Sequence, residues 1–156
     1  MTNNEIEKQY SELKKKYKLP GFKEIDWELE LSDLEQTNFL IRAIMRRIAE
    51  KLEFYSTMLE EVLQPDASNI YAMHENRFFD EDEKKQMYDI YRKLMTFSRK
   101  SVELSMKSNP EEEAEFINEF YDEWQGIKKE LVRYIRKMKD SWQFDTDIKE
   151  DVGYLG

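Results

Sequence analysis

Carboxylates are the residues of this chain most able to take part in chemistry, and the densest group of them lies in its last third. Glu111, Glu112 and Glu115 form an E-E-x-x-E pattern, and Glu119 with Asp122 forms an E-x-x-D pattern shortly after it. Carboxylate oxygens are the usual protein ligands of Mg²⁺. The spacing therefore raises the question of a metal-dependent enzyme.

The two patterns resemble the acidic motifs of the MazG-type nucleotide pyrophosphohydrolases, in which E-E-x-x-E is followed on another helix by E-x-x-D. The resemblance implies a helical enzyme that holds Mg²⁺ with these carboxylates and hydrolyses nucleotides. In this chain both patterns fall on one predicted helix, so they cannot face each other across a bundle and enclose a metal and a triphosphate. Acidic residues in a first turn also complement the positive end of the helix dipole. We therefore keep this enzyme class as a remote alternative.

Histidine and cysteine would be the other signs of a metal or nucleophilic site, but the chain has one histidine and no cysteine. A ferritin-like di-iron centre needs Glu-x-x-His pairs on two helices, whereas His74 stands alone between two predicted helices. There is no Gly-rich phosphate-binding loop and no base to activate a Ser or Thr nucleophile. We predict a chain that is not an enzyme, with no catalytic, cofactor-binding or metal-ligating residue. The lack of cysteine is typical of intracellular proteins, so we expect a cytoplasmic location.

Basic residues gather between residues 128 and 139, where Lys129, Arg133 and Arg136 are candidate contacts to phosphate groups. This pattern supports an alternative function as a nucleic-acid-associated factor. The formal net charge of −9 argues against it, because the field of the whole molecule repels phosphate. A solvated, ion-paired helix face is the more common outcome for such a cluster.

Helices are the elements expected to position all of these residues, because the chain has only 4 Gly and 3 Pro and sheets with many tight turns need more of both. Four helix starts are indicated by capping boxes or by an N-cap followed by proline: Thr2 with Glu5, Ser32 with Glu35, Asp80 with Glu83, and Asn109 with Pro110. The predicted helices end before Pro20, before Pro65, near Asn109 and near Lys139.

Apolar residues on the three longer helices repeat at alternating steps of three and four, which is the pattern of a left-handed coiled-coil seam. The expected fold is all-α: an antiparallel bundle of three long helices plus a shorter N-terminal helix. We expect one domain over residues 1–141, followed by an acidic and apolar tail over 142–156. Nothing in the chain approaches the apolar length of a membrane span, so no contact with a membrane is expected.

Two connectors complete the predicted fold. Residues 19–31 contain Trp27-Glu-Leu-Glu-Leu31, whose alternation of apolar and acidic residues predicts an extended segment lying on the bundle. Its expected anchors are Phe22, Ile25, Trp27, Leu29 and Leu31. Residues 64–79 are rich in apolar side chains and are expected to cover one end of the bundle.

Long regular helices offer rigid surface and few concave pockets, so the sequence favours a non-catalytic protein-interaction or assembly subunit. Its partner would be another protein or a second copy of the chain, as in a homodimer. The expected contact residues lie in the two connectors and the tail: Trp27, Tyr71, His74, Phe78, Phe79, Trp142 and Phe144. The alternative for each of them is that it covers the bundle from within the same chain.

Overall fold

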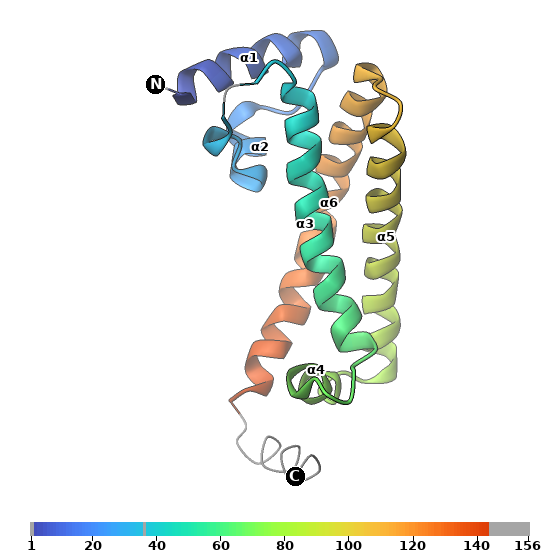
Figure 1. The fold of residues 1–156 in the computed structure, drawn as a ribbon. Coiled ribbons are helices and arrows are strands. Elements are labelled where there is room, and N and C mark those ends of the chain that lie inside the picture. The colour runs from blue at the N-terminus through green and yellow to red at the C-terminus, as the bar shows by residue number, and fades with distance from the viewer. Residues whose placement is uncertain (1, 36, 144–156) are drawn as a thin grey trace. The chain divides into compact units, whose positions relative to one another are not determined.

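A computed structural model describes residues 2–35 and 37–143, with side chains from residue 5 onward. Within these residues the chain is all-helical and contains no strand (Figure 1). The elements are α1 (Thr2–Tyr17), α2 (Phe22–Leu29), the 3-10 turn η1 (Leu31–Asp33), α3 (Leu40–Leu63), α4 (Ile70–Asn76), α5 (Glu81–Ser105) and α6 (Pro110–Ser141). The all-α prediction is confirmed, and none of the helices described has an apolar stretch that would span a membrane.

The residues group into two compact units, each built from two separate stretches of the chain. Unit 1 consists of Met1–Glu53 and Phe97–Gln125. Unit 2 consists of Phe54–Thr96 and the described residues from Gly126 onward. The three long helices α3, α5 and α6 each supply residues to both units.

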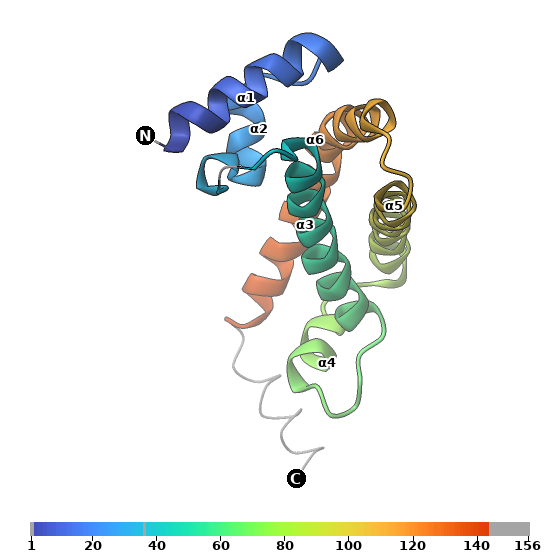
Figure 2. The same ribbon diagram turned by 45° about the horizontal axis from the view of Figure 1, so that its top comes forward.

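In unit 1 the first two helices pack together around Tyr10, as Figure 2 shows for α1 and α2. The Tyr10 ring is fully buried and lies 5.5 Å from the ring of Phe22, centroid to centroid. Its hydroxyl donates a 2.5 Å hydrogen bond to the carbonyl of Pro20, and burial raises the pKa of that hydroxyl well above its ordinary value. The tyrosine thus fixes the turn that follows α1.

The prediction of an extended segment over residues 19–31 is wrong, because residues 22–29 form the helix α2. Ile25, Glu28 and Leu29 are buried on one face, at the steps of three and four that a helix requires. Trp27, one of the predicted anchors, is 82% exposed. The alternation of Trp27, Leu29 and Leu31 is too short to distinguish the two-residue period of a strand from the period of a helix. The acidic Glu28 on the buried face also interrupts the apolar pattern by which a helix is recognised.

The predicted helix start at Ser32 is also wrong, since α3 begins at Leu40. The backbone N–H of Ser32 donates to the carboxylate of Asp26 at 2.7 Å, so this residue completes the end of α2 instead. The turn before α3 is held by Thr37, whose hydroxyl oxygen accepts the N–H of Phe39 at 3.1 Å. Ser32 and Glu35 therefore have the spacing of a capping box but do not begin a helix.

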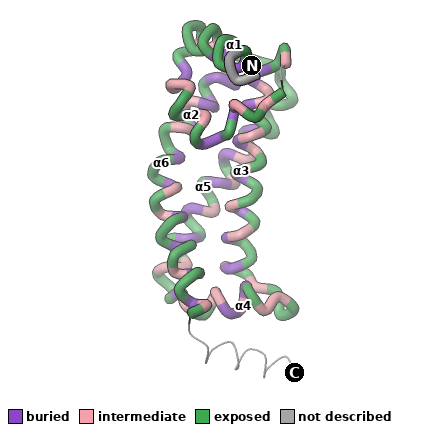
Figure 3. The backbone as a smooth tube through the Cα atoms, turned by 90° about the vertical axis from the view of Figure 1, so that its left-hand side faces the viewer, coloured by how far each residue is buried: buried purple, intermediate pink, exposed green. Residues whose placement is uncertain are grey.

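The two later helix starts are confirmed. Asp80 accepts the N–H of Glu83 at 2.7 Å, and Glu83 accepts the N–H of Asp80 at 3.1 Å, which is a complete capping box for α5. Asn109 accepts the N–H groups of Glu111 and Glu112 at the start of α6. Buried positions then recur along both helices, as the purple segments of Figure 3 show. They repeat at steps of three and four and include Met87, Ile90, Leu94 and Phe97 on α5 and Ile117, Phe120, Trp124, Ile127, Leu131, Tyr134 and Met138 on α6.

In unit 2 the connector between α3 and α5 folds into the short helix α4 and docks through its side chains. Asn69 caps α4 by accepting the N–H of Ala72, and the Asn76 amide donates to the carbonyl of Val62 at 2.6 Å. His74 is fully buried, with its Nε2 3.0 Å from the carbonyl oxygen of Ser141. The connector therefore buries Ala72, His74 and Phe79 in unit 2 and leaves its other residues partly or fully exposed.

Candidate functional site

A cleft of about 440 Å³ opens in unit 1 beside the first turn of α6. Its walls are formed by one face of α1, the start of α3 with the two residues before it, the turn between α5 and α6, and the first turn of α6. Its lining is Gln9, Glu12, Leu13, Tyr17, Asn38, Phe39, Leu40, Ile41, Arg42, Ser108, Pro110 and Glu113. The cleft thus combines an apolar wall with a few polar groups, which is the usual make-up of a ligand site.

Glu113 is the most unusual residue of this cleft, because its side chain is only 3% exposed and yet has no partner. Within the described residues its carboxylate forms no hydrogen bond and no ion pair. Burial raises the pKa of Glu113, and the positive charge of Arg42 acts in the opposite direction. The same residue lines a neighbouring groove of about 190 Å³, together with Arg46. This mostly buried acidic residue therefore borders two open spaces.

Arg42 is the cation whose charge acts on the Glu113 carboxyl group, but its guanidinium is hydrogen-bonded to other residues. It donates to the hydroxyl of Ser108 at 2.5 Å and to the carbonyl of Ser105 at 3.4 Å. Ser108 itself has a positive φ of 54°, which turns the chain from α5 toward α6. The turn thus holds the guanidinium by two oxygens that carry no charge.

Gln9 contributes a second unpaired acceptor to the cleft. Its amide nitrogen donates to the carbonyl of Thr37 at 2.5 Å, which fixes the orientation of the side chain. Its oxygen is buried and has no donor within the described residues. The Gln9 oxygen is therefore a buried acceptor without a donor at the cleft, and such a group costs free energy when it is left unpaired.

The sequence-based prediction missed Glu113, although a signal for it exists. Glu113 stands four residues before Ile117 and so continues the apolar face that runs on through Phe120 and Trp124. An acid on an apolar face is the kind of exception that marks a site. It was overlooked because the acidic first turn of α6 was explained as a whole by the helix dipole.

Two of the predicted partner contacts, Tyr71 and Trp142, come together on the surface of unit 2. Their ring centroids lie 6.0 Å apart, although the residues are far apart in sequence. Tyr71 is 71% exposed, and both rings line a groove of about 440 Å³ with Ser68, Asn69 and Ile70. The Trp142 indole N–H donates to Glu75 at 3.1 Å, which fixes the orientation of the indole.

The other predicted contacts lie elsewhere. His74 and Phe79 are buried and Phe78 is half-buried, so the first two are core residues of unit 2 and not surface residues. His74 was predicted as a contact because it lies in the connector over residues 64–79, but its ring packs 4.2 Å from the indole of Trp142. Trp27 is exposed in unit 1, and Phe144 lies outside the described residues.

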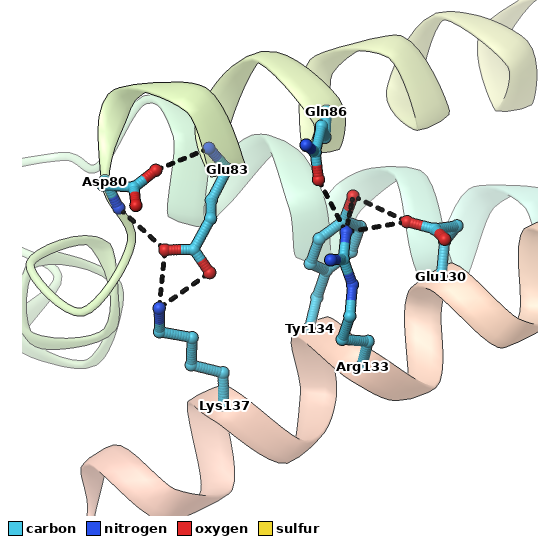
Figure 4. A network of polar contacts seen from close by, with 7 residues as sticks. All are labelled: Asp80, Glu83, Gln86, Glu130, Arg133, Tyr134 and Lys137. Carbon is cyan, nitrogen blue, oxygen red and sulfur yellow. Dashed lines mark hydrogen bonds and ion pairs between the residues drawn. The ribbon is translucent and has the colours of Figure 1, made fainter.

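The predicted phosphate contacts Lys129, Arg133 and Arg136 are all exposed on α6, but part of this basic face is already paired. Arg133 donates to Gln86 of α5 at 2.7 Å and to Glu130 at 2.8 Å (Figure 4). In the same figure, Lys137 holds both oxygens of the capping residue Glu83. These charges link α6 to α5 within unit 2.

The acidic motif that opens α6 is distributed along one helix. Glu119 forms an ion pair with Lys100 of α5 at 2.6 Å, and Glu111 lies in the first turn. Within the described residues, no three His, Cys, Asp or Glu side chains are grouped in a way that would hold a metal ion.

Comparison with protein families, with curated proteins and with solved structures found no match to this chain.

Proposed function

We propose that this chain is a non-catalytic helical interaction protein that binds a partner protein through the Tyr71–Trp142 surface of unit 2. The observation that carries the proposal is the juxtaposition of these two aromatic rings beside a groove. Tyrosine and tryptophan are enriched among the residues that dominate binding energy in protein interfaces. Here the indole is oriented by its bond to Glu75, so it loses little freedom on binding.

The charge around this surface indicates the chemistry of the partner. Glu75 contacts the indole directly, and Asp66 accepts the N–H of Ser68 on the rim of the groove. Hydrogen bonds from Ser68 lower the pKa of Asp66, which keeps that carboxylate ionised. The chain as a whole carries −9. We infer a partner segment that places an apolar side chain in the groove and basic residues beside it, because a second copy of this acidic chain would be repelled.

Affinity purification of the full chain from its native source tests this proposal. We expect a partner in stoichiometric amount, retained at low salt and released as salt rises. Tyr71→Ser should lose this partner, whereas Tyr88→Ser, which changes another exposed tyrosine of unit 2, should keep it. Recovery of no stoichiometric partner at any salt concentration would overturn the proposal. So would a dimer of the chain alone that Tyr71→Ser dissociates, since the surface would then bind a second copy.

We further propose that the three long helices form an antiparallel bundle with left-handed coiled-coil packing. Support comes from unit 2, where Glu83 pairs with Lys137 and Gln86 with Arg133, so that numbers rise on α5 as they fall on α6. Cysteines introduced at 86 and 133 should be cross-linked by a short bismaleimide, since Gln86 and Arg133 are hydrogen-bonded to each other. The chain has no other cysteine that could react. Cysteines at 93 and 133 should not be cross-linked, since the first has moved about 10 Å along its helix. Equal yields from the two pairs would contradict this packing.

A further inference from the structure

The cleft of unit 1 contains hydrogen-bond acceptors that no donor of the described residues reaches. Glu113 is 3% exposed, and its carboxylate has no hydrogen bond or ion pair to another described residue. The Gln9 oxygen beside the same space is buried without a donor. Leaving a buried acceptor such as the Gln9 oxygen without a partner costs about 1–3 kcal/mol. A protein that retains this cost beside an open cleft gains most from a ligand that supplies the missing donors.

We propose that this cleft binds an alkylammonium or alkylguanidinium group, with the cation on Glu113 and the alkyl part against Phe39 and Leu13. A cation with several N–H donors satisfies both acceptors at once, whereas a neutral hydroxyl supplies one donor and an anion supplies none. The lining carries the carboxylates of Glu12 and Glu113 against the single guanidinium of Arg42, which leaves it net negative. Phe39, exposed at the mouth, provides an apolar and cation-attracting face.

Arg42 does not fill this role itself, because its hydrogen bonds to the Ser108 hydroxyl and the Ser105 carbonyl hold the guanidinium beyond ion-pair distance from Glu113. Its charge then opposes the entry of a cationic ligand. Removing the charge of Arg42 should therefore strengthen the binding of a cation. If the cleft bound an anion instead, the same change would weaken binding.

In the binding experiment, n-butylammonium and n-butylguanidinium are titrated into the full chain, and two-dimensional NMR follows the chemical shifts of the protein. For ligands of so few atoms we expect saturable binding with a Kd on the order of 1–10 mM. Pentanoate and n-butanol carry the same butyl group without the cation and should not saturate. N-acetyl-lysine methylamide distinguishes the two natural sources of the cation, because a site for a peptide side chain accepts it and a site for a free amine excludes its backbone.

Variants then assign the binding to the cleft. Glu113→Gln should weaken the binding of both cations at least tenfold, and Glu115→Gln should leave it unchanged, because Glu115 is exposed on the same helix and does not line the cleft. Phe39→Ala, a change at an exposed residue, should weaken binding without affecting the fold. Arg42→Gln should strengthen it. Failure of both cations to saturate, or equal binding to wild type and Glu113→Gln, would overturn the proposal.

Discussion

Replacing Glu28 by glutamine is expected to lower the free energy of unfolding by about 2–3 kcal/mol, because this buried carboxylate joins α2 to the rest of unit 1. Its Oε2 accepts the indole N–H of Trp124 at 2.7 Å and lies 3.6 Å from the Lys51 ammonium. Lys51 also donates to the Glu28 carbonyl at 2.5 Å and lies 5.0 Å from the centre of the Trp124 ring. Glutamine keeps the shape of the side chain, removes its charge and replaces one acceptor oxygen by an NH2 donor.

The magnitude follows from two losses. A bond to a charged acceptor is about twice as strong as one to a neutral acceptor, so the Trp124 hydrogen bond weakens by about 1 kcal/mol. The ion pair with Lys51 contributes between about 1 kcal/mol in water and about 4 kcal/mol at an effective dielectric constant of 20. The Lys51 side chain is partly open to solvent, at 21% exposure. A net loss of about 1–2 kcal/mol for this pair is therefore expected after screening and desolvation.

Urea unfolding followed by far-UV circular dichroism and by tryptophan fluorescence measures this loss directly. Glu24→Gln is the matched control, because Glu24 is an exposed carboxylate of the same helix, and its change should stay within about 0.5 kcal/mol. A double-mutant cycle of Glu28→Gln with Lys51→Met should give a coupling energy of about 1–2 kcal/mol. If Glu28→Gln unfolds like the Glu24 control, the carboxylate does not hold α2 and the reasoning is refuted.

Three further changes test other parts of the structure. Glu30 ends α2 with a positive φ of 55°, so Glu30→Gly should raise the free energy of unfolding by about 1 kcal/mol, and a fall would contradict the strain. Asp80→Ala removes the N-cap of α5 and should lower the melting temperature through a loss of about 1 kcal/mol; an unchanged temperature would speak against the capping box. The pKa of Glu113 is raised by burial, so the folded state holds its proton at pH values where the unfolded state has released it, and stability falls as the pH rises above 4.5. Glu113→Gln should therefore be more stable than wild type at neutral pH and equal to it near pH 4 in urea titrations, whereas a constant difference would exclude the titration.

Local signals in the sequence were enough to predict parts of this fold. The capping box of Asp80 and Glu83 and the N-cap Asn109 each depend on residues within one helical turn, so their patterns can be recognised without knowing what surrounds them. The same pattern failed at Ser32. There the backbone N–H had a competing acceptor, Asp26, that only the folded α2 brings within reach.

The candidate site depends on tertiary structure and could not be predicted in the same way. Gln9, Phe39 and Glu113 belong to three elements that are distant in sequence, and no period relates them. The juxtaposition of Tyr71 and Trp142 likewise follows from the docking of α4 against the end of α6. Both aromatic residues were predicted as contacts from their type and from their place in a connector or the tail. The sequence did not predict that the two rings lie side by side.

The affinity of the purified partner protein for wild type and for variants tests whether the Tyr71–Trp142 surface binds that partner. Isothermal titration should show at least tenfold weaker binding to Tyr71→Ser than to wild type, which corresponds to about 1.4 kcal/mol or more at an aromatic interface residue. Tyr88→Ser should bind within about twofold of wild type, as an exposed residue away from the groove. Equal affinities of wild type and Tyr71→Ser would contradict the claim.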